Sequence, residues 1–147
     1  MPEINPTPCF LDTNVWLYAF VVTQDPAKSN IAKGIIQSNE IIVSVQVINE
    51  LSINLIKKAQ FDEVRIQRLI ASFYDRQQVI EIGKEVLLTA SDLRARYRFS
   101  FWDSLIIASA LIGGSSIVYS EDMDDGLLVD NSLRIVNPFR LASTESE

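Results

Sequence analysis

Four acidic side chains occupy positions where folding could gather them into one polar site. Asp12 directly follows the apolar run 9–11, and Asp122 comes shortly after a second apolar run. Glu50 and Asp103 lie among apolar residues in segments with helical spacing. Carboxylates brought together repel one another, and an all-oxygen ligand set suits a hard divalent cation. The pattern therefore predicts a site for Mg²⁺ or Mn²⁺.

Each acid also has a structural explanation. Asp12 is suited to cap the N-terminus of a helix, and Asp103 has the spacing of a capping box with Ser100. A single glutamate such as Glu50 is most often a solvated helix residue. The prediction of a metal site therefore depends on the set of acids and not on any one of them.

Short apolar runs alternate with helical patterns along the chain. We predict strands at 9–11, 41–43, 79–82, 117–119 and 133–136, and helices at 14–22, 26–37, 45–58, 62–74, 84–97 and 100–112. Strands that are apolar on both faces and alternate with helices form parallel sheets covered by helices. The sequence predicts an α/β fold, a three-layer α/β/α sandwich whose central, mostly parallel sheet has four to five strands. Ligands of such sheets bind outside the carboxyl ends of the strands, where these acids lie.

The length and composition fit one domain. The chain has 147 residues, of which 48% are hydrophobic and 22% charged, and it shows no internal repeat or long linker. We expect a single domain over 1–147, with a core at about 8–140 and a disordered tail at 142–147.

Two counts exclude several kinds of chemistry. The chain has no histidine, which rules out Ser-His-Asp and Cys-His nucleophile systems and zinc sites that need an imidazole. Its one cysteine, Cys9, allows no disulfide within the chain, which fits a reducing compartment.

No stretch reaches the roughly 18 to 20 apolar residues of a membrane span, and residues 1–8 do not resemble a signal peptide. We expect a cytoplasmic protein that does not enter a membrane.

The formal net charge of -6 argues against a broad basic face that grips nucleic acid. It does not exclude a nuclease, because bound divalent ions invert the local charge. Arg94, Arg96 and Arg98 precede Asp103 and are candidates for phosphate contacts. Their two-residue spacing spreads them around a helix, so a solvated helix end is the favoured interpretation.

Four ordered motifs resemble the PIN-domain ribonucleases, and among them the VapC-like toxins of type II toxin-antitoxin systems. The motifs are Phe-Leu-Asp-Thr-Asn-Val at 10–15, Asn-Glu-Leu at 49–51, Phe-Trp-Asp-Ser-Leu-Ile at 101–106 and Ser-Glu-Asp at 120–122. The resemblance spans nearly the whole chain, and four matches in order are more specific than any one short motif.

The resemblance implies a metal-dependent endoribonuclease that is the toxin of a type II pair. It places the catalytic and metal-binding acids at Asp12, Glu50, Asp103 and Asp122, with Asn14 and Ser120 in support. It further implies a homodimer and a small antitoxin that blocks the acidic crevice. Asp124 and Asp125 stay outside the site, because the family varies there and a solvated acidic turn explains them.

The expected reaction is hydrolysis of an RNA phosphodiester by metal-activated water. Asp12, Asp103 and Asp122 would hold one or two ions, and Glu50 would either bind an ion or orient the water. One alternative is a non-catalytic protein-interaction module in which the acids only cap helices. Another is an aspartyl-phosphate phosphatase, which is disfavoured because Asn14 stands where that chemistry usually has a second aspartate.

Overall fold

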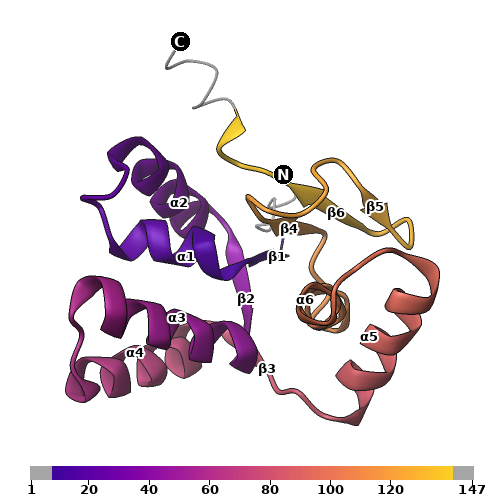
Figure 1. The fold of residues 1–147 in the computed structure, drawn as a ribbon, viewed down its shortest axis with the longest axis horizontal. Coiled ribbons are helices and arrows are strands. Elements are labelled where there is room, and N and C mark those ends of the chain that lie inside the picture. Colours follow the sequence, from indigo (N-terminus) through magenta and orange to yellow (C-terminus); the bar gives the residue numbers. More distant parts are fainter. Residues whose placement is uncertain (1–7, 141–147) are drawn as a thin grey trace, which may run out of the picture.

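The computed structural model describes residues 8–140, so the predicted tail at 142–147 lies outside the described residues. This part of the chain forms six strands and six helices, with a pair of helices after each of the first three strands and the last three strands in succession (Figure 1). The strands are β1 (Pro8–Leu11), β2 (Glu40–Ser44), β3 (Gln78–Ile80), β4 (Ile117–Tyr119), β5 (Leu128–Val129) and β6 (Leu133–Val136). The helices are α1 (Thr13–Phe20), α2 (Pro26–Ser38), α3 (Val45–Ala59), α4 (Glu63–Arg76), α5 (Lys84–Arg96) and α6 (Phe101–Ile112).

The strands form one sheet in the order β3-β2-β1-β4-β6-β5. All neighbouring strands run parallel except β5 and β6, which are antiparallel. The predicted α/β fold with a mostly parallel sheet is thus confirmed, but the predicted strand number was one too low. The unpredicted strand is β5, whose two residues are too few to leave a pattern in the sequence. It pairs with β6 across a turn in which Asp130 and Asn131 both have positive φ.

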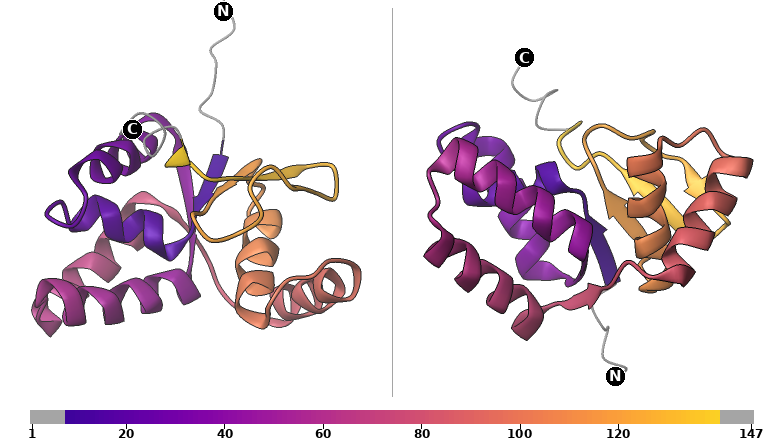
Figure 2. Two further views of the ribbon diagram at one scale, coloured as in Figure 1. Left: turned by 45° about the horizontal axis from the view of Figure 1, so that its top comes forward. Right: turned by 60° about the horizontal axis from the view of Figure 1, so that its bottom comes forward.

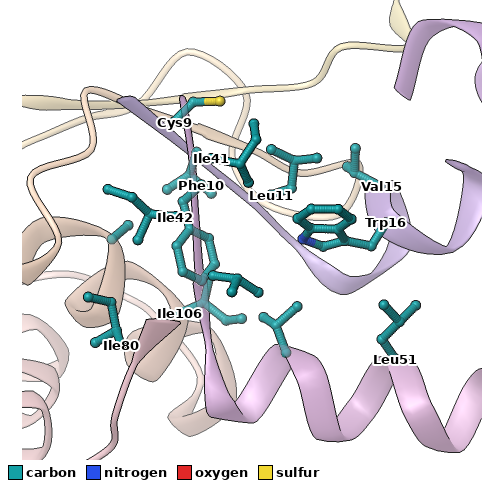
Figure 3. Close-up of a cluster of buried hydrophobic side chains, with 14 of the residues drawn as sticks. Cys9, Phe10, Leu11, Val15, Trp16, Ile41, Ile42, Leu51, Ile80 and Ile106 are labelled. Carbon is teal, nitrogen blue, oxygen red and sulfur yellow. The ribbon is translucent and has the colours of Figure 1, made fainter. Parts of the chain in front are cut away.

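Helices cover both faces of the sheet. Figure 2 shows α1 to α4 on one side and α5 and α6 on the other, which gives the predicted three layers. The core lies between them, and the central strands are buried on both faces. Figure 3 shows Phe10 and Ile42 of adjacent strands packed with Ile106 of α6. Cys9 is 1% exposed in this core, and burial raises the pKa of its thiol to about 12.

Helix α6 is the buried helix that its apolar sequence predicts, apart from its first turn. Ile106, Ile107 and Ala108 are fully buried, whereas Phe101 and Trp102 are exposed. At its end, a Cβ on Gly113 would lie 2.8 Å from Cγ2 of Ile42, so the absence of a side chain lets α6 pack closely on β2. This contact fixes the helix that carries Asp103.

No helix formed by residues 8–140 combines the length and the apolar character that crossing a membrane requires.

Candidate functional site

The site begins where β1 and β4 end side by side. The two strands are parallel neighbours, with Leu11 paired to Tyr119, so Asp12 and Ser120 emerge at the same edge of the sheet. The chain leaves β1 for β2 on one side and later returns to β4 on the other, which makes this the point where the strand order switches direction. Ser120 Oγ donates to Oδ2 of Asp12 over 2.9 Å.

Asp12 caps helix α1 and also lies where its negative charge is disfavoured. Its Oδ1 accepts a hydrogen bond from the Thr13 backbone N–H at 2.8 Å, so it does cap α1. Burial raises the pKa of Asp12 to about 6, although the hydrogen bonds from Ser120 and Thr13 oppose the rise. The charges of Asp103 and Glu50 raise the pKa further. The capping and functional interpretations of Asp12 are therefore compatible.

Glu50 reaches the same region from the second turn of α3. It is half-buried, and its Oε2 accepts a hydrogen bond from Thr13 Oγ1 at 3.1 Å. Thr13 is 2% exposed, so this bond ties α3 to the start of α1 from inside the fold. Thr13 is not among the predicted site residues. Its only sequence signal is its place directly after Asp12.

Asp103 lies in the first turn of α6, on the other face of the sheet. Its backbone N–H donates to Ser100 Oγ at 3.0 Å, which confirms Ser100 as the cap of this helix. The carboxyl group is half-buried, and burial raises its pKa. The charge of Asp122 adds to this rise, whereas Ser100 opposes it.

Asp122 is exposed and is held by the two residues predicted to support the site. Asn14 Nδ2 donates to its Oδ2 at 2.6 Å, and its backbone N–H donates to Ser120 Oγ at 3.2 Å. Ser120 is fully buried, and it also accepts a hydrogen bond from the Met123 N–H. One hydroxyl thus links Asp12 to the loop that carries Asp122.

The four acids influence one another's charges in a chain. Asp12 is coupled to Glu50 and to Asp103, and Asp103 is coupled to Asp122. The ion pairs found within residues 8–140 involve other acids, namely Glu121, Asp92, Asp130 and Asp125. The structure therefore brings the predicted acids to one sheet edge and gives them no basic partner in those pairs.

A divalent cation fits this site by the chemistry of its donors and by charge. The donors are carboxylate, amide and hydroxyl oxygens. Burial is the main cause of the raised pKa values of Asp12 and Asp103, and a cation would offset the repulsion from neighbouring acids that adds to it. Among residues 8–140, however, no three side chains of Asp, Glu or Cys lie close enough to hold one ion together. An ion here would bind fewer carboxylates and keep several waters, as Mg²⁺ commonly does.

A second polar network, which the sequence did not predict, borders the site. Lys28 of α2 forms an ion pair with Glu121, and Tyr18 Oη donates to the same carboxylate at 3.0 Å. The hydrogen bond from Lys28 Nζ to Glu121 is the main reason that the pKa of Lys28 is raised. The network ties the loop after β4 to α1 and α2, and it neutralises the acid next to Asp122.

Asp125 and Arg96 have structural partners away from the four acids. Asp125 accepts a hydrogen bond from the Asn137 N–H at 2.8 Å and pairs with Arg140, which agrees with its exclusion from the site. Arg96 pairs with Asp92 and Asp130 on the surface of α5. Its role there fits the interpretation of a solvated helix end.

Arg94 has contacts different from those of Arg96. Its guanidinium lies 3.8 Å from the centre of the Phe101 ring and donates to Ser104 Oγ at 2.7 Å. It is held against the first turn of α6, the turn that contains Asp103.

Comparison with solved structures shows the same fold in toxin-antitoxin proteins. A toxin-antitoxin complex from Klebsiella pneumoniae superposes with a TM-score of 0.66 at 18% identity, covering 88% of this chain and 97% of that one. VapC20 of Mycobacterium tuberculosis, a toxin that cleaves the sarcin-ricin loop, gives a TM-score of 0.62 at 20% identity, over 79% of this chain and 91% of that one. VapBC2 from Rickettsia felis, bound to a promoter DNA fragment, gives 0.61 at 18%, over 89% and 100%.

A search of the curated proteins gave no match. The family model of the PIN domain matches residues 9–126, which include all four acids of the site. From the carboxylates at the switch point of the sheet and this match, we conclude that the chain belongs to the PIN domain family.

Proposed function

We propose that this protein is a metal-dependent endoribonuclease. The observation that carries the proposal is the set of four coupled carboxylates at the carboxyl edge of the sheet, two of which have raised pKa values. PIN-domain nucleases generally use divalent metals. A purely structural role as helix caps does not explain the four acids, because Asp12 is the one member of the set that caps a helix. VapC20, whose fold is similar, cleaves the sarcin-ricin loop, which makes RNA the substrate to test first.

The residues would divide the work as follows. Asp12, Asp103 and Asp122 would hold one or two Mg²⁺ or Mn²⁺ ions, with at most two of these carboxylates on any one ion and water as its other ligands. Glu50 would bind an ion or orient the attacking water. Such an ion lowers the pKa of bound water and offsets negative charge on the phosphate. Ser120 and Asn14 hold Asp12 and Asp122 in place, and Thr13 holds Glu50.

We further propose that the protein is the toxin of a type II toxin-antitoxin pair. The proteins of similar fold include toxin-antitoxin complexes from Klebsiella pneumoniae and Rickettsia felis, which supports an antitoxin as partner. A homodimer and a cytoplasmic location belong to the same proposal. Growth arrest on induced expression, absent for Asp103→Asn, is the expected cellular result.

The decisive experiment is incubation with total RNA, with Mn²⁺ or with a chelator, followed by mapping of the cut ends. We expect cuts only with Mn²⁺, and we expect Asp12→Asn to reduce cleavage by about 100-fold or more. Asp75→Asn is the matched control, because Asp75 is an exposed acid on α4 and is not among the charges that shift the pKa values of Asp12 and Asp103. It should cleave as the unmodified protein does.

Two results would contradict the proposal. Cleavage that Asp12→Asn leaves at full rate would show that a contaminant or another site is responsible. A complete lack of cleavage, together with no Mg²⁺ or Mn²⁺ binding in calorimetry, would favour the non-catalytic interaction module.

A further inference from the structure

A pocket of about 450 Å³ lies at the first turns of α3 and α6, the two helices that carry Glu50 and Asp103. It is open to solvent and is walled by α3, the end of α4, the segment after β3 and the first turns of α6. We call it the α3–α6 pocket. Its lining is mostly apolar, and it consists of Val45, Gln46, Ile48, Asn49, Ser52, Ile70, Tyr74, Ile82, Trp102 and Leu105.

The pocket adjoins the parts of α3 and α6 that carry two of the acids. Asn49 and Trp102 line the pocket, and each directly precedes one of the acids, Glu50 and Asp103. Strands β2 and β3 end beneath the pocket, whereas β1 and β4 end beneath Asp12 and the loop that carries Asp122. A polymer whose phosphate lies at the acids would therefore place a neighbouring unit at the pocket.

Two aromatic rings are available on the pocket wall. Trp102 is 46% exposed and Tyr74 is 50% exposed, although both are large side chains that folding usually covers. Tyr74 Oη donates to Glu81 at 2.9 Å, which holds its ring in position. Exposed aromatic rings beside a nucleic-acid site are the common means of stacking unpaired bases.

Gln46 is a buried polar residue of the pocket with an unmet hydrogen bond. It is 6% exposed, and its Nε2 donates to the Trp102 carbonyl oxygen over 3.4 Å. Because a carbonyl oxygen only accepts, this contact leaves the Oε1 atom as the free end of the amide, and Oε1 has no partner within residues 8–140. Buried acceptors without partners are rare in native proteins. The long contact restrains the amide weakly, so a small rotation would turn Oε1 toward a ligand.

We propose that the α3–α6 pocket binds one unpaired nucleobase of the RNA, next to the phosphate that is cleaved, and that Gln46 Oε1 accepts an N–H of this base. The inference rests on the proposed function and adds a specificity-determining residue to it. A base fits because it is flat, stacks on Trp102 and carries amino or imino donors. A purely apolar protein side chain would fill the pocket but leave Oε1 without a donor.

The binding test uses Trp102 as its own reporter. The chain has two tryptophans, and Trp16 is buried, so Trp16→Phe leaves a single tryptophan in the pocket. Asp12→Asn is added to prevent cleavage. We expect single-stranded oligoribonucleotides to quench this fluorescence and abasic oligomers of the same length to quench it little. Gln46→Met should weaken binding of the preferred base by roughly five- to tenfold.

The cleavage test maps cut sites in a random RNA pool for active enzymes. The unmodified protein should prefer certain bases at one fixed position beside the cut, and Gln46→Met should lose this preference while still cleaving. Gln67→Met is the matched control, because Gln67 is exposed on α4 and does not line the pocket. Trp102→Leu should reduce the preference as well, which guards against a folding defect specific to one variant.

The outcomes separate the two proposals. If the unmodified protein cleaves RNA and Gln46→Met keeps the same base preference, the pocket inference is overturned and the proposed nuclease function stands. The same conclusion follows if the unmodified protein cleaves RNA but oligoribonucleotides do not quench the fluorescence of Trp102. Acrylamide quenching of Trp102 tests for a second copy of the chain in the pocket. If quenching weakens as the protein concentration rises, and RNA does not change this, a second copy occupies the pocket and the pocket inference is overturned. Loss of all cleavage in the unmodified protein would instead overturn the proposed function.

Discussion

At the scale of single residues, Asp12 is a source of instability at neutral pH. Burial beside other acids raises its pKa from 3.8 to about 6, so the folded state binds this proton more tightly than the unfolded state does. The stability that this group contributes is therefore fully present below about pH 4 and is lost as the pH rises through 6. A raised pKa of this size corresponds to at most about 3 kcal/mol of unfolding free energy.

Asp12→Asn should therefore stabilise the metal-free protein at neutral pH. We expect a gain of about 1 to 3 kcal/mol in the free energy of unfolding at pH 7.5, shrinking toward zero near pH 4. Urea unfolding in the presence of chelator, repeated across this range, measures the difference. An equal loss of stability at every pH would mean that the lost hydrogen bonds to Asp12 outweigh its charge.

Ser120 is expected to be the residue on which the geometry of the acids depends most. Its buried hydroxyl donates to Asp12 and accepts from two backbone N–H groups, at Asp122 and Met123. Ser120→Ala should lower the unfolding free energy by about 1 to 3 kcal/mol, because it leaves buried polar groups unpaired. Thermal unfolding checks this, with Ser91→Ala on the exposed face of α5 as control. Equal melting temperatures for the two variants would contradict it.

At the scale of elements, α6 holds Asp103 in place through its close packing on the sheet. A Cβ on Gly113 would approach Ile42 Cγ2 to 2.8 Å and Ile80 Cδ1 to 3.2 Å. The φ of Gly113 is -74°, so backbone conformation adds no penalty and the expected cost of Gly113→Ala is purely steric. We predict a loss of about 1 to 3 kcal/mol.

The control for this substitution has the opposite expected sign. Gly34 lies exposed within α2, and a Cβ there would meet nothing within 4 Å. Gly34→Ala should stabilise by about 0.5 to 1 kcal/mol, because alanine favours a helix. Chemical unfolding of both variants provides the comparison. If Gly113→Ala were as stable as Gly34→Ala, the packing of α6 on β2 would be looser than the structure shows.

The elements themselves could be predicted because their signals are local. Asp25 followed by Pro26 marks the start of α2, and Ser100 marks the start of α6, and both caps are observed. Strand β5 could not be predicted, because its pairing with β6 depends on a turn and not on a pattern of its own. Helix α4 shows a related limit, since Val64 and Ile70 match a helical apolar face but are exposed.

The gathering of acids at one edge followed from strand order and could be predicted, but the contacts among polar side chains could not. The bond from Thr13 to Glu50 joins residues 37 apart, and the Lys28–Glu121 pair joins residues 93 apart. Such pairs leave no periodic or local signal. They depend on how α1, α2 and α3 pack together, which is a property of the tertiary structure.

At the scale of the whole molecule, the acids come from both layers of helices. Asp12 and Glu50 are associated with α1 and α3 on one face of the sheet, whereas Asp103 belongs to α6 on the other (Figure 2). Their mutual repulsion acts between the two layers across the carboxyl edge of the sheet. A bound cation would replace this repulsion with an attraction between the layers, so its effect should appear in global unfolding.

Mn²⁺ should therefore raise the melting temperature of the whole domain. A ligand at 100 times its dissociation constant stabilises the folded state by about 2.7 kcal/mol, which corresponds to roughly 5 to 10 °C for a chain of this size. We expect the increase to be reversed by chelator and to be largely absent in the double variant Asp12→Asn, Asp103→Asn. Differential scanning calorimetry with and without Mn²⁺ measures it, and Asp75→Asn should respond as the unmodified protein does. An equal increase in the double variant would place the ion elsewhere on the surface and would remove the electrostatic basis for a metal at this edge.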